Sequence, residues 1–142
     1  MTRFRQQALA LGFIAVLLGS TVPSSAATNL VVNQNSNHRT IILKRGTSLT
    51  LSLNSTYWTI RTSYSPAVVT AVGKTTVKPI FPGPTAPSGC KVPGMGCGTV
   101  MQRFKATRVG TTSITASRTT CGEAMLCAPD KRNFAIKVVV IK

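Results

Sequence analysis

Acidic and imidazole side chains are almost absent from this chain. Its 142 residues include 17 lysines and arginines but only two carboxylates, Glu123 and Asp130, and one histidine, His38. The two acids share one short segment, and His38 lies among asparagines and a glutamine, so neither paired-acid hydrolysis nor a Ser-His-Asp arrangement is indicated. A phosphate-binding glycine-rich loop and a cluster of metal-ligating histidines are missing as well. The sequence therefore predicts a protein that is not an enzyme and that binds no metal or cofactor.

No apolar run in the chain reaches the roughly 20 residues of a membrane-spanning helix. The apolar run at residues 8–18 follows two arginines and precedes a Ser-Ser-Ala sequence that ends at Ala26, which is the pattern of a cleavable export signal. An uncleaved N-terminal anchor is the alternative. We expect residues 1–26 to be a signal peptide and residues 27–142 to form one domain. The protein is then secreted, or resides in the periplasm or cell envelope.

Positive charge dominates residues 27–142, which remain after the expected cleavage. Loss of the two arginines of the signal reduces the formal charge from +15 to +13. Such a field attracts acidic partners, among them anionic cell-wall polymers, phospholipid head groups, nucleic acids and acidic protein clefts. The basic residues are scattered and form no dense run, so a diffuse solvated surface explains them as well. Export and the absence of aromatics among the basic residues argue against specific nucleic-acid binding.

Four cysteines form two local groups. Cys90 and Cys97 bracket one short segment, and Cys121 and Cys127 bracket another. An even number of cysteines in an exported chain favours disulfides, and three connectivities are possible. Local pairing is the simplest, whereas crossed pairing would tie the two segments together. A four-cysteine zinc site is the rival interpretation, although neither pair has the spacing of two to four residues typical of structural zinc sites.

Alternating hydrophobicity predicts β-strands. Residues 47–53 place Leu49, Leu51 and Leu53 on one face, and residues 133–141 alternate in the same way. Turn signals separate further segments rich in Thr, Val, Ile and aromatic residues, and they lie at Arg45-Gly46, Ser65-Pro66, Val72-Gly73 and Val109-Gly110. These candidate strands are residues 40–43, 57–62, 68–72, 99–106 and 111–117.

About seven short antiparallel strands and one tryptophan, Trp58, early in the third strand indicate an all-β fold, an immunoglobulin-like β-sandwich with Trp58 in its core. One segment departs from this pattern. Residues 79–98 contain five prolines and many glycines and predict a long loop braced by a disulfide. Such a loop on a rigid scaffold is a natural place for binding.

Several segments resemble the chagasin-type inhibitors of cysteine peptidases. Residues 94–106, Gly-Met-Gly-Cys-Gly-Thr-Val-Met-Gln-Arg-Phe-Lys-Ala, are followed by Val-Gly-Thr-Thr and then by Ser-Arg at Arg118, as in the second half of that family. Residues 54–58, Asn-Ser-Thr-Tyr-Trp, resemble its first loop, although they are shorter and lack its Pro, one Thr and its Gly. Thr119 and Thr120 stand where the family has Pro and Trp. Shorter phrases also resemble bacterial immunoglobulin-like domains.

The resemblance covers roughly residues 46–142 and implies a domain that inserts three loops, from one end of the sandwich, into the cleft of a papain-like peptidase. Two functions are therefore expected. The first is a secreted, non-catalytic, monomeric binding domain whose loops and basic surface contact the cell envelope or another extracellular partner. The alternative is a chagasin-like inhibitor. The candidate partner-binding residues are Asn54, Ser55, Thr56, Tyr57, Gly94, Met95, Gly96, Gly98, Arg118, Thr119 and Thr120.

Overall fold

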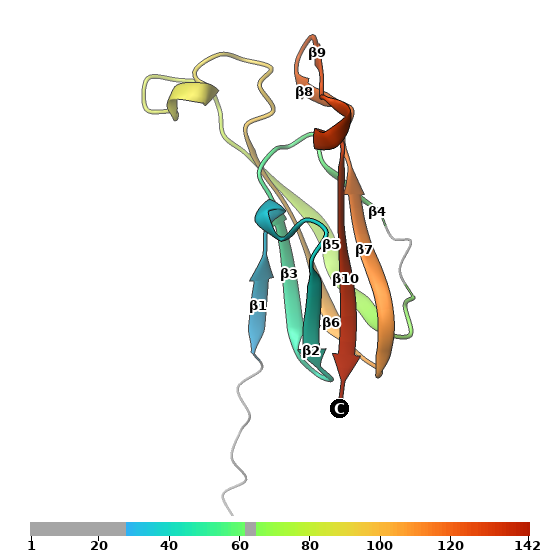
Figure 1. Ribbon diagram of the computed structural model, residues 1–142. Helices are drawn as coiled ribbons and strands as arrows, with labels where there is room; N and C mark the ends of the chain where they lie inside the picture. Colours follow the sequence, from blue (N-terminus) through green and yellow to red (C-terminus); the bar gives the residue numbers. More distant parts are fainter. Residues whose placement is uncertain (1–27, 62–64) are drawn as a thin grey trace, which may run out of the picture.

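The computed structural model describes residues 28–61 and 65–142, so the expected signal peptide lies outside the described residues. Within them, ten β-strands form two four-stranded sheets and a small hairpin (Figure 1). The first sheet has the order β1 (Asn29–Val32), β3 (Ser48–Leu53), β6 (Gly98–Ala106), β5 (Val69–Pro79). The second has the order β2 (Thr40–Lys44), β10 (Asn133–Ile141), β7 (Gly110–Ser117), β4 (Thr59–Arg61).

The remaining elements are short. The hairpin pairs β8 (Thr120–Gly122) with β9 (Met125–Leu126). Three single-turn 3₁₀ helices complete the described chain: η1 (Gln34–Ser36), η2 (Ser88–Cys90) and η3 (Pro129–Lys131). None of the helices in the described part of the chain is long and apolar enough to cross a membrane.

The two sheets pack face to face over the alternating apolar residues. Leu49, Leu51 and Leu53 of β3 are fully buried, as are the inward residues of β10. Trp58 is 7% exposed and belongs to the same core. The immunoglobulin-like sandwich predicted from the alternation is thereby confirmed, because each sheet presents one apolar face to the other.

The sequence indicated antiparallel strands, but two of the strand pairs are parallel. β1 pairs in parallel with β3, and β2 pairs in parallel with β10. A parallel pair cannot be joined by a tight hairpin. The chain satisfies this rule by crossing between the sheets, from β1 to β2 and back to β3, and β2 meets the last strand of the chain. The strands β1, β8 and β9 were not expected.

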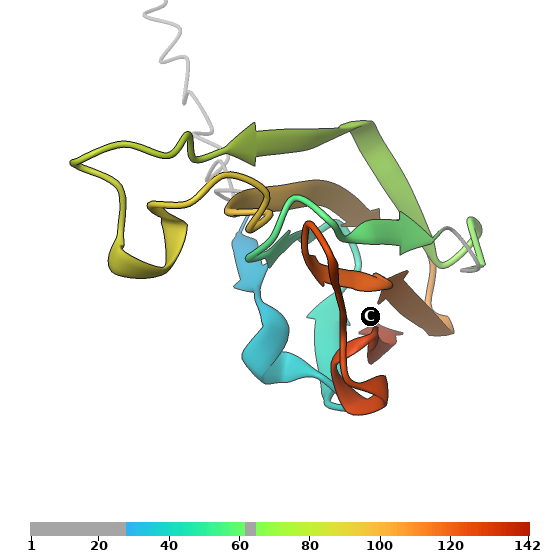
Figure 2. The same ribbon diagram turned by 90° about the horizontal axis from the view of Figure 1, so that it is seen from above.

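The turn expected at Val72-Gly73 is wrong. β5 continues through this point to Pro79, with a shift of register between Val72 and Thr76, where the strand bends (Figure 2). Gly73 has φ +71°, which suits a bulge that a side chain would strain. The buried Gln102 holds the bulge, since its amide donates to the carbonyls of Val72 and Gly73 and its carbonyl accepts from the Thr75 hydroxyl.

One end of the sandwich carries the connection between β1 and β2, which contains η1, and three loops. Loop 1 (residues 54–58) follows β3, loop 2 (residues 80–97) joins β5 to β6, and loop 3 (residues 118–132) joins β7 to β10 and contains the β8–β9 hairpin. All three lie at the end opposite the C-terminus (Figure 1). We call this end the loop pole. The outer part of loop 2, with η2, extends sideways from the sandwich (Figure 2).

Candidate functional site

Loops 1 and 2 are joined by two hydrogen bonds. The backbone N–H of Thr56 donates to the carbonyl of Gly96 over 2.8 Å, and the Tyr57 hydroxyl donates to the carbonyl of Gly94 over 2.7 Å. Both glycines have left-handed backbones, with φ +76° at Gly94 and +63° at Gly96. A Cβ added at Gly96 would collide with the Tyr57 ring. Glycine is thus required by the backbone conformation and by the close approach of the ring.

Loop 3 closes on loop 2 from the other side. A Cβ added at Gly94 would collide with the Glu123 side chain, so this backbone and that side chain are in direct contact. The Met95 sulfur lies 3.9 Å from where a Cβ of Gly122 would stand. The Gly-rich part of loop 2 is therefore held between Tyr57 of loop 1 and the β8–β9 hairpin of loop 3.

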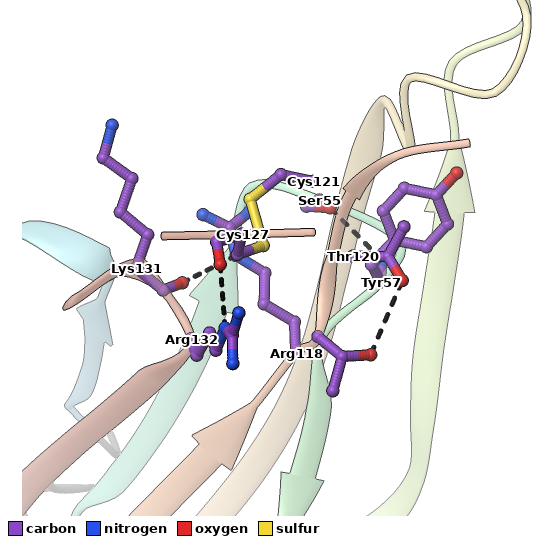
Figure 3. Close-up of a disulfide and its surroundings, with 9 residues drawn as sticks. Ser55, Tyr57, Arg118, Thr120, Cys121, Cys127, Lys131 and Arg132 are labelled. Atoms are coloured by element: carbon purple, nitrogen blue, oxygen red, sulfur yellow. Dashed lines mark hydrogen bonds between the residues drawn. A yellow bond between two sulfur atoms is a disulfide. The ribbon is translucent and has the colours of Figure 1, made fainter. Parts of the chain in front are cut away.

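Loop 3 is braced by a disulfide and by main-chain hydrogen bonds. The cysteines pair locally, Cys90 with Cys97 and Cys121 with Cys127, which is the simplest of the connectivities that the sequence allowed. Cys127 also donates from its backbone N–H to the Thr119 carbonyl, and its carbonyl accepts from the Arg132 guanidinium. Figure 3 shows the disulfide between Cys121 and Cys127 with Arg132 beside it. The short hairpin is fixed at both of its ends.

Arg118 attaches loop 3 to the core. Its guanidinium lies over the Trp58 ring, 4.5 Å from the ring centroid, and its Nε donates to the Lys131 carbonyl over 3.0 Å. Partial burial lowers the pKa of Arg118 by desolvating the charge. A cation over an aromatic face is attracted by the negative centre of the ring. Arg118 therefore fixes loop 3 upon the residue that ends loop 1.

The loop pole exposes apolar side chains. Met95 of loop 2 is 40% exposed, and Met125 and Leu126 at the tip of loop 3 are 58% and 75% exposed. Phe81 and Val92 are exposed on the outer part of loop 2. Exposed apolar side chains on well-held loops make the loop pole a candidate surface for binding a partner.

An open hollow of about 660 Å³ lies beside the pole, between loop 1, the edge strand β4 and the start of loop 3. Tyr57, Arg61, Arg118 and Thr119 are among the residues that line it. Its charged groups are arginines, and no group of three metal-ligating side chains occurs within residues 28–61 and 65–142. Among the described residues that line the hollow, no carboxylate lies beside the arginines.

The structure brings most of the expected site residues together. Thr56, Tyr57, Gly94, Met95 and Gly96 form the contact between loops 1 and 2, and Thr119 and Thr120 begin the hairpin of loop 3. Gly98 is the first residue of β6, where a Cβ would meet the Thr56 methyl and the backbone of Lys78 and Pro79.

Three expected site residues have other places. Ser55 is buried, and its hydroxyl accepts from the backbone N–H of Tyr57, so it shapes the turn. Asn54 donates from its backbone to the Gln34 side chain of η1. Arg118 lies on Trp58, as described above. Sequence reasoning missed Met125 and Leu126. The signal that could have found them is a pair of apolar residues in a polar loop between two closely spaced cysteines.

Solved structures with the same fold include a cysteine protease inhibitor. EhICP2 from Entamoeba histolytica matches with a TM-score of 0.55 and 15% identity, over 80% of this chain and 96% of that inhibitor. Amebosin matches with a TM-score of 0.48 and 16% identity, over 80% and 98% of the two chains. PbICP-C, in complex with falcipain-2, matches with a TM-score of 0.30 and 15% identity, over 80% and 97%. Neither a protein-family model nor a curated protein matches this sequence. The likeness to EhICP2 shows that the chain has a chagasin-type fold.

Proposed function

We propose that this protein is a secreted inhibitor of papain-like cysteine peptidases and that the loop pole blocks their active-site cleft. The observation that carries the proposal is the mutual attachment of the three loops, through Tyr57 and Gly94, Met95 and Gly122, and Arg118 and Trp58. These are the loops that the resemblance to chagasin-type inhibitors implies. The likeness to EhICP2 favours this function over the envelope-binding domain.

Rigid loops suit this function because inhibition by occlusion needs no reactive group. An inhibitor that is already ordered loses little conformational entropy when it binds, and protease–inhibitor interfaces bury about 1,600 Å² between such preformed surfaces. Two disulfides and the contacts between loops hold the pole in one shape. Binding then excludes substrate from the cleft without any covalent step.

The exposed apolar side chains provide the binding affinity of the loop pole. Met95 lies at the centre, between loop 1 and loop 3, and Met125 and Leu126 extend the apolar surface along the hairpin. Methionine is unbranched and polarisable, so it adapts to irregular apolar pockets. Burial of these side chains against a peptidase supplies the favourable free energy, at roughly 25 cal/mol per Å² of apolar surface removed from water.

Titration of papain with the folded protein tests the proposal. We expect inhibition with a Ki below micromolar, which no added metal or cofactor changes. Met95→Asp should raise Ki about tenfold or more, because a central contact residue typically contributes over 1 kcal/mol. Val109→Asp is the matched control, since Val109 is similarly exposed, at 46%, in the turn between β6 and β7 at the other end of the sandwich.

Two results would contradict the proposal. One is the absence of inhibition of papain, and of other papain-like enzymes, by micromolar protein whose circular dichroism shows folded β-structure. The other is an equal loss of inhibition in Met95→Asp and Val109→Asp, because the contact would then not lie at the loop pole.

A further inference from the structure

The outer face of the β1-β3-β6-β5 sheet carries cations in ordered positions. Arg103 and Lys105 of β6 are exposed, whereas Gln102 and Phe104 between and beside them are buried, so the two cations share the outward face. Along a strand, side chains two residues apart on one face are about 7 Å apart. The two charges therefore stand side by side on a flat surface.

Hydroxyl groups flank these cations across the sheet. Lys105 lies between Ser48 of β3 and Thr70 of β5 in the strand register. Arg103 lies between Thr50 of β3 and the exposed Val72 of β5. Directly opposed residues in a sheet have neighbouring side chains. The Thr50 and Thr70 hydroxyls donate to the Asn29 side chain and the Pro66 carbonyl, so toward a ligand beside the cations they act as acceptors.

The cationic row continues toward the other end of the face. Lys78 of β5 pairs with Thr99 of β6, and Lys74 is exposed in the bulge of β5. Thr99 is four residues from Arg103, or about 13 Å along the strand. The cations thus extend over most of the length of β6, as a linear ligand with repeated charges requires.

No acidic group of the described residues neutralises this face. The two acids of the chain, Glu123 and Asp130, both lie in loop 3. Within residues 28–61 and 65–142, Lys78, Arg103 and Lys105 have no side-chain hydrogen bond or ion pair. Their charges are therefore free to bind an external anion.

The opposite sheet offers a useful contrast. Its outward positions also include three cations, Lys44, Arg61 and Lys137, but Ile42 and Ile141 are exposed among them. Arg61 is hydrogen-bonded to the Ser117 hydroxyl. That face carries the same number of cations, but they are spread over β2, β4 and β10, whereas the cations of the first face follow β6 and its neighbour β5 in one row.

We infer that the outer face of the β1-β3-β6-β5 sheet binds a linear anionic polysaccharide. Lys78, Arg103 and Lys105 pair with the carboxylate or sulfate groups, and the Ser and Thr hydroxyls hydrogen-bond to the sugar hydroxyls. The described outward positions of this face hold no aromatic side chain, so base stacking, on which single-stranded nucleic acid binding depends, is not offered. The face is separate from the loop pole, and polysaccharide and peptidase are bound independently.

Heparin is the probe for this surface. We compare the variant Lys78→Ser, Arg103→Thr and Lys105→Ser with the control variant Lys44→Ser, Arg61→Thr and Lys137→Ser, which loses the same charge from the opposite sheet. The first variant should elute from heparin-agarose at clearly lower NaCl concentration than the control. Release of counterions from a polyanion predicts that its slope of log Kd against log [NaCl] falls by about two to three, and the control slope by less than one.

Equal losses in the two triple variants would overturn the inference, because they would show diffuse attraction by net charge. Tighter binding of the unmodified protein to duplex DNA, or to vesicles of anionic phospholipid, than to heparin at the same salt concentration would also overturn it. Thermal unfolding checks that each variant is folded. The single variants Arg103→Thr and Lys137→Ser repeat the comparison where a triple variant unfolds. Papain inhibition should be unchanged in the variant Lys78→Ser, Arg103→Thr and Lys105→Ser, which separates this inference from the proposed function.

Discussion

Substitution of Arg118 tests whether this residue contacts the peptidase directly or positions loop 3. Its guanidinium rests 4.5 Å from the centroid of the Trp58 ring, and its Nε donates to the Lys131 carbonyl. A cation–π contact contributes about 0.5–2 kcal/mol, and a hydrogen bond from a charged group about 1.5–3 kcal/mol. Because Arg118 is only partly buried, we take the lower ends and expect Arg118→Ala to reduce the free energy of unfolding by about 2 kcal/mol.

Arg132→Ala is the matched control. Arg132 lies in the same loop and donates to the Cys127 carbonyl, but among the described residues its guanidinium lies over no aromatic ring. We expect it to cost about 1.5 kcal/mol, the lower end for a hydrogen bond from a charged group, because it loses that bond but no ring contact. Urea unfolding measures both values. Trp58 is the only tryptophan of the chain, so its fluorescence should change in Arg118→Ala and stay constant in Arg132→Ala.

The reasoning is refuted if Arg118→Ala keeps its stability and its Trp58 emission while its Ki for papain rises. Arg118 would then touch the peptidase directly, as the resemblance to chagasin-type inhibitors implied. If instead stability, emission and Ki change together, Arg118 acts by fixing loop 3.

Two further predictions concern the shape of the loops. Gly96→Ala should weaken inhibition of papain at least about tenfold, because its Cβ collides with the Tyr57 ring. Gly46 also has a positive φ but has open space around it, so Gly46→Ala should affect stability alone. Equal Ki values for the two variants would contradict this. Replacing Cys121 and Cys127 together by serine should lower the free energy of unfolding by about 2 kcal/mol, the value for closing so short a loop. Urea unfolding and papain titration measure the two effects, and unchanged Ki in the double variant would show that the hairpin of loop 3 takes no part in binding.

The strands were predictable where burial imposes a period on the sequence. Leu49, Leu51 and Leu53 alternate because one face of β3 is buried against the other sheet, and β10 behaves likewise. β1 was missed because only Val32 of its four residues is buried. The turn expected at Gly73 was wrong because the local signal is the same for a turn and a bulge. The choice was made by a distant residue, the buried Gln102.

The candidate site was predictable only in part, for the same reason. The Gly-rich segment and the Asn-Ser-Thr-Tyr segment could be found from the residues, but their meeting depends on a hydrogen bond across 37 residues, from Tyr57 to Gly94. The place of Arg118 on Trp58 spans 60 positions in the sequence. Contacts of this range follow from the packing of the sheets, which no local pattern encodes.

The loop contacts also connect the pole to the core. Loop 1 ends at Trp58, which is buried between the sheets, and loop 3 rests on that ring through Arg118. Loop 2 is held in turn by Tyr57, the residue before the tryptophan. All three loops are therefore attached, directly or through Tyr57, to the buried Trp58. Their relative positions are thus set by the packing of the sandwich. This explains how loops from three separate connections can present a surface of fixed shape.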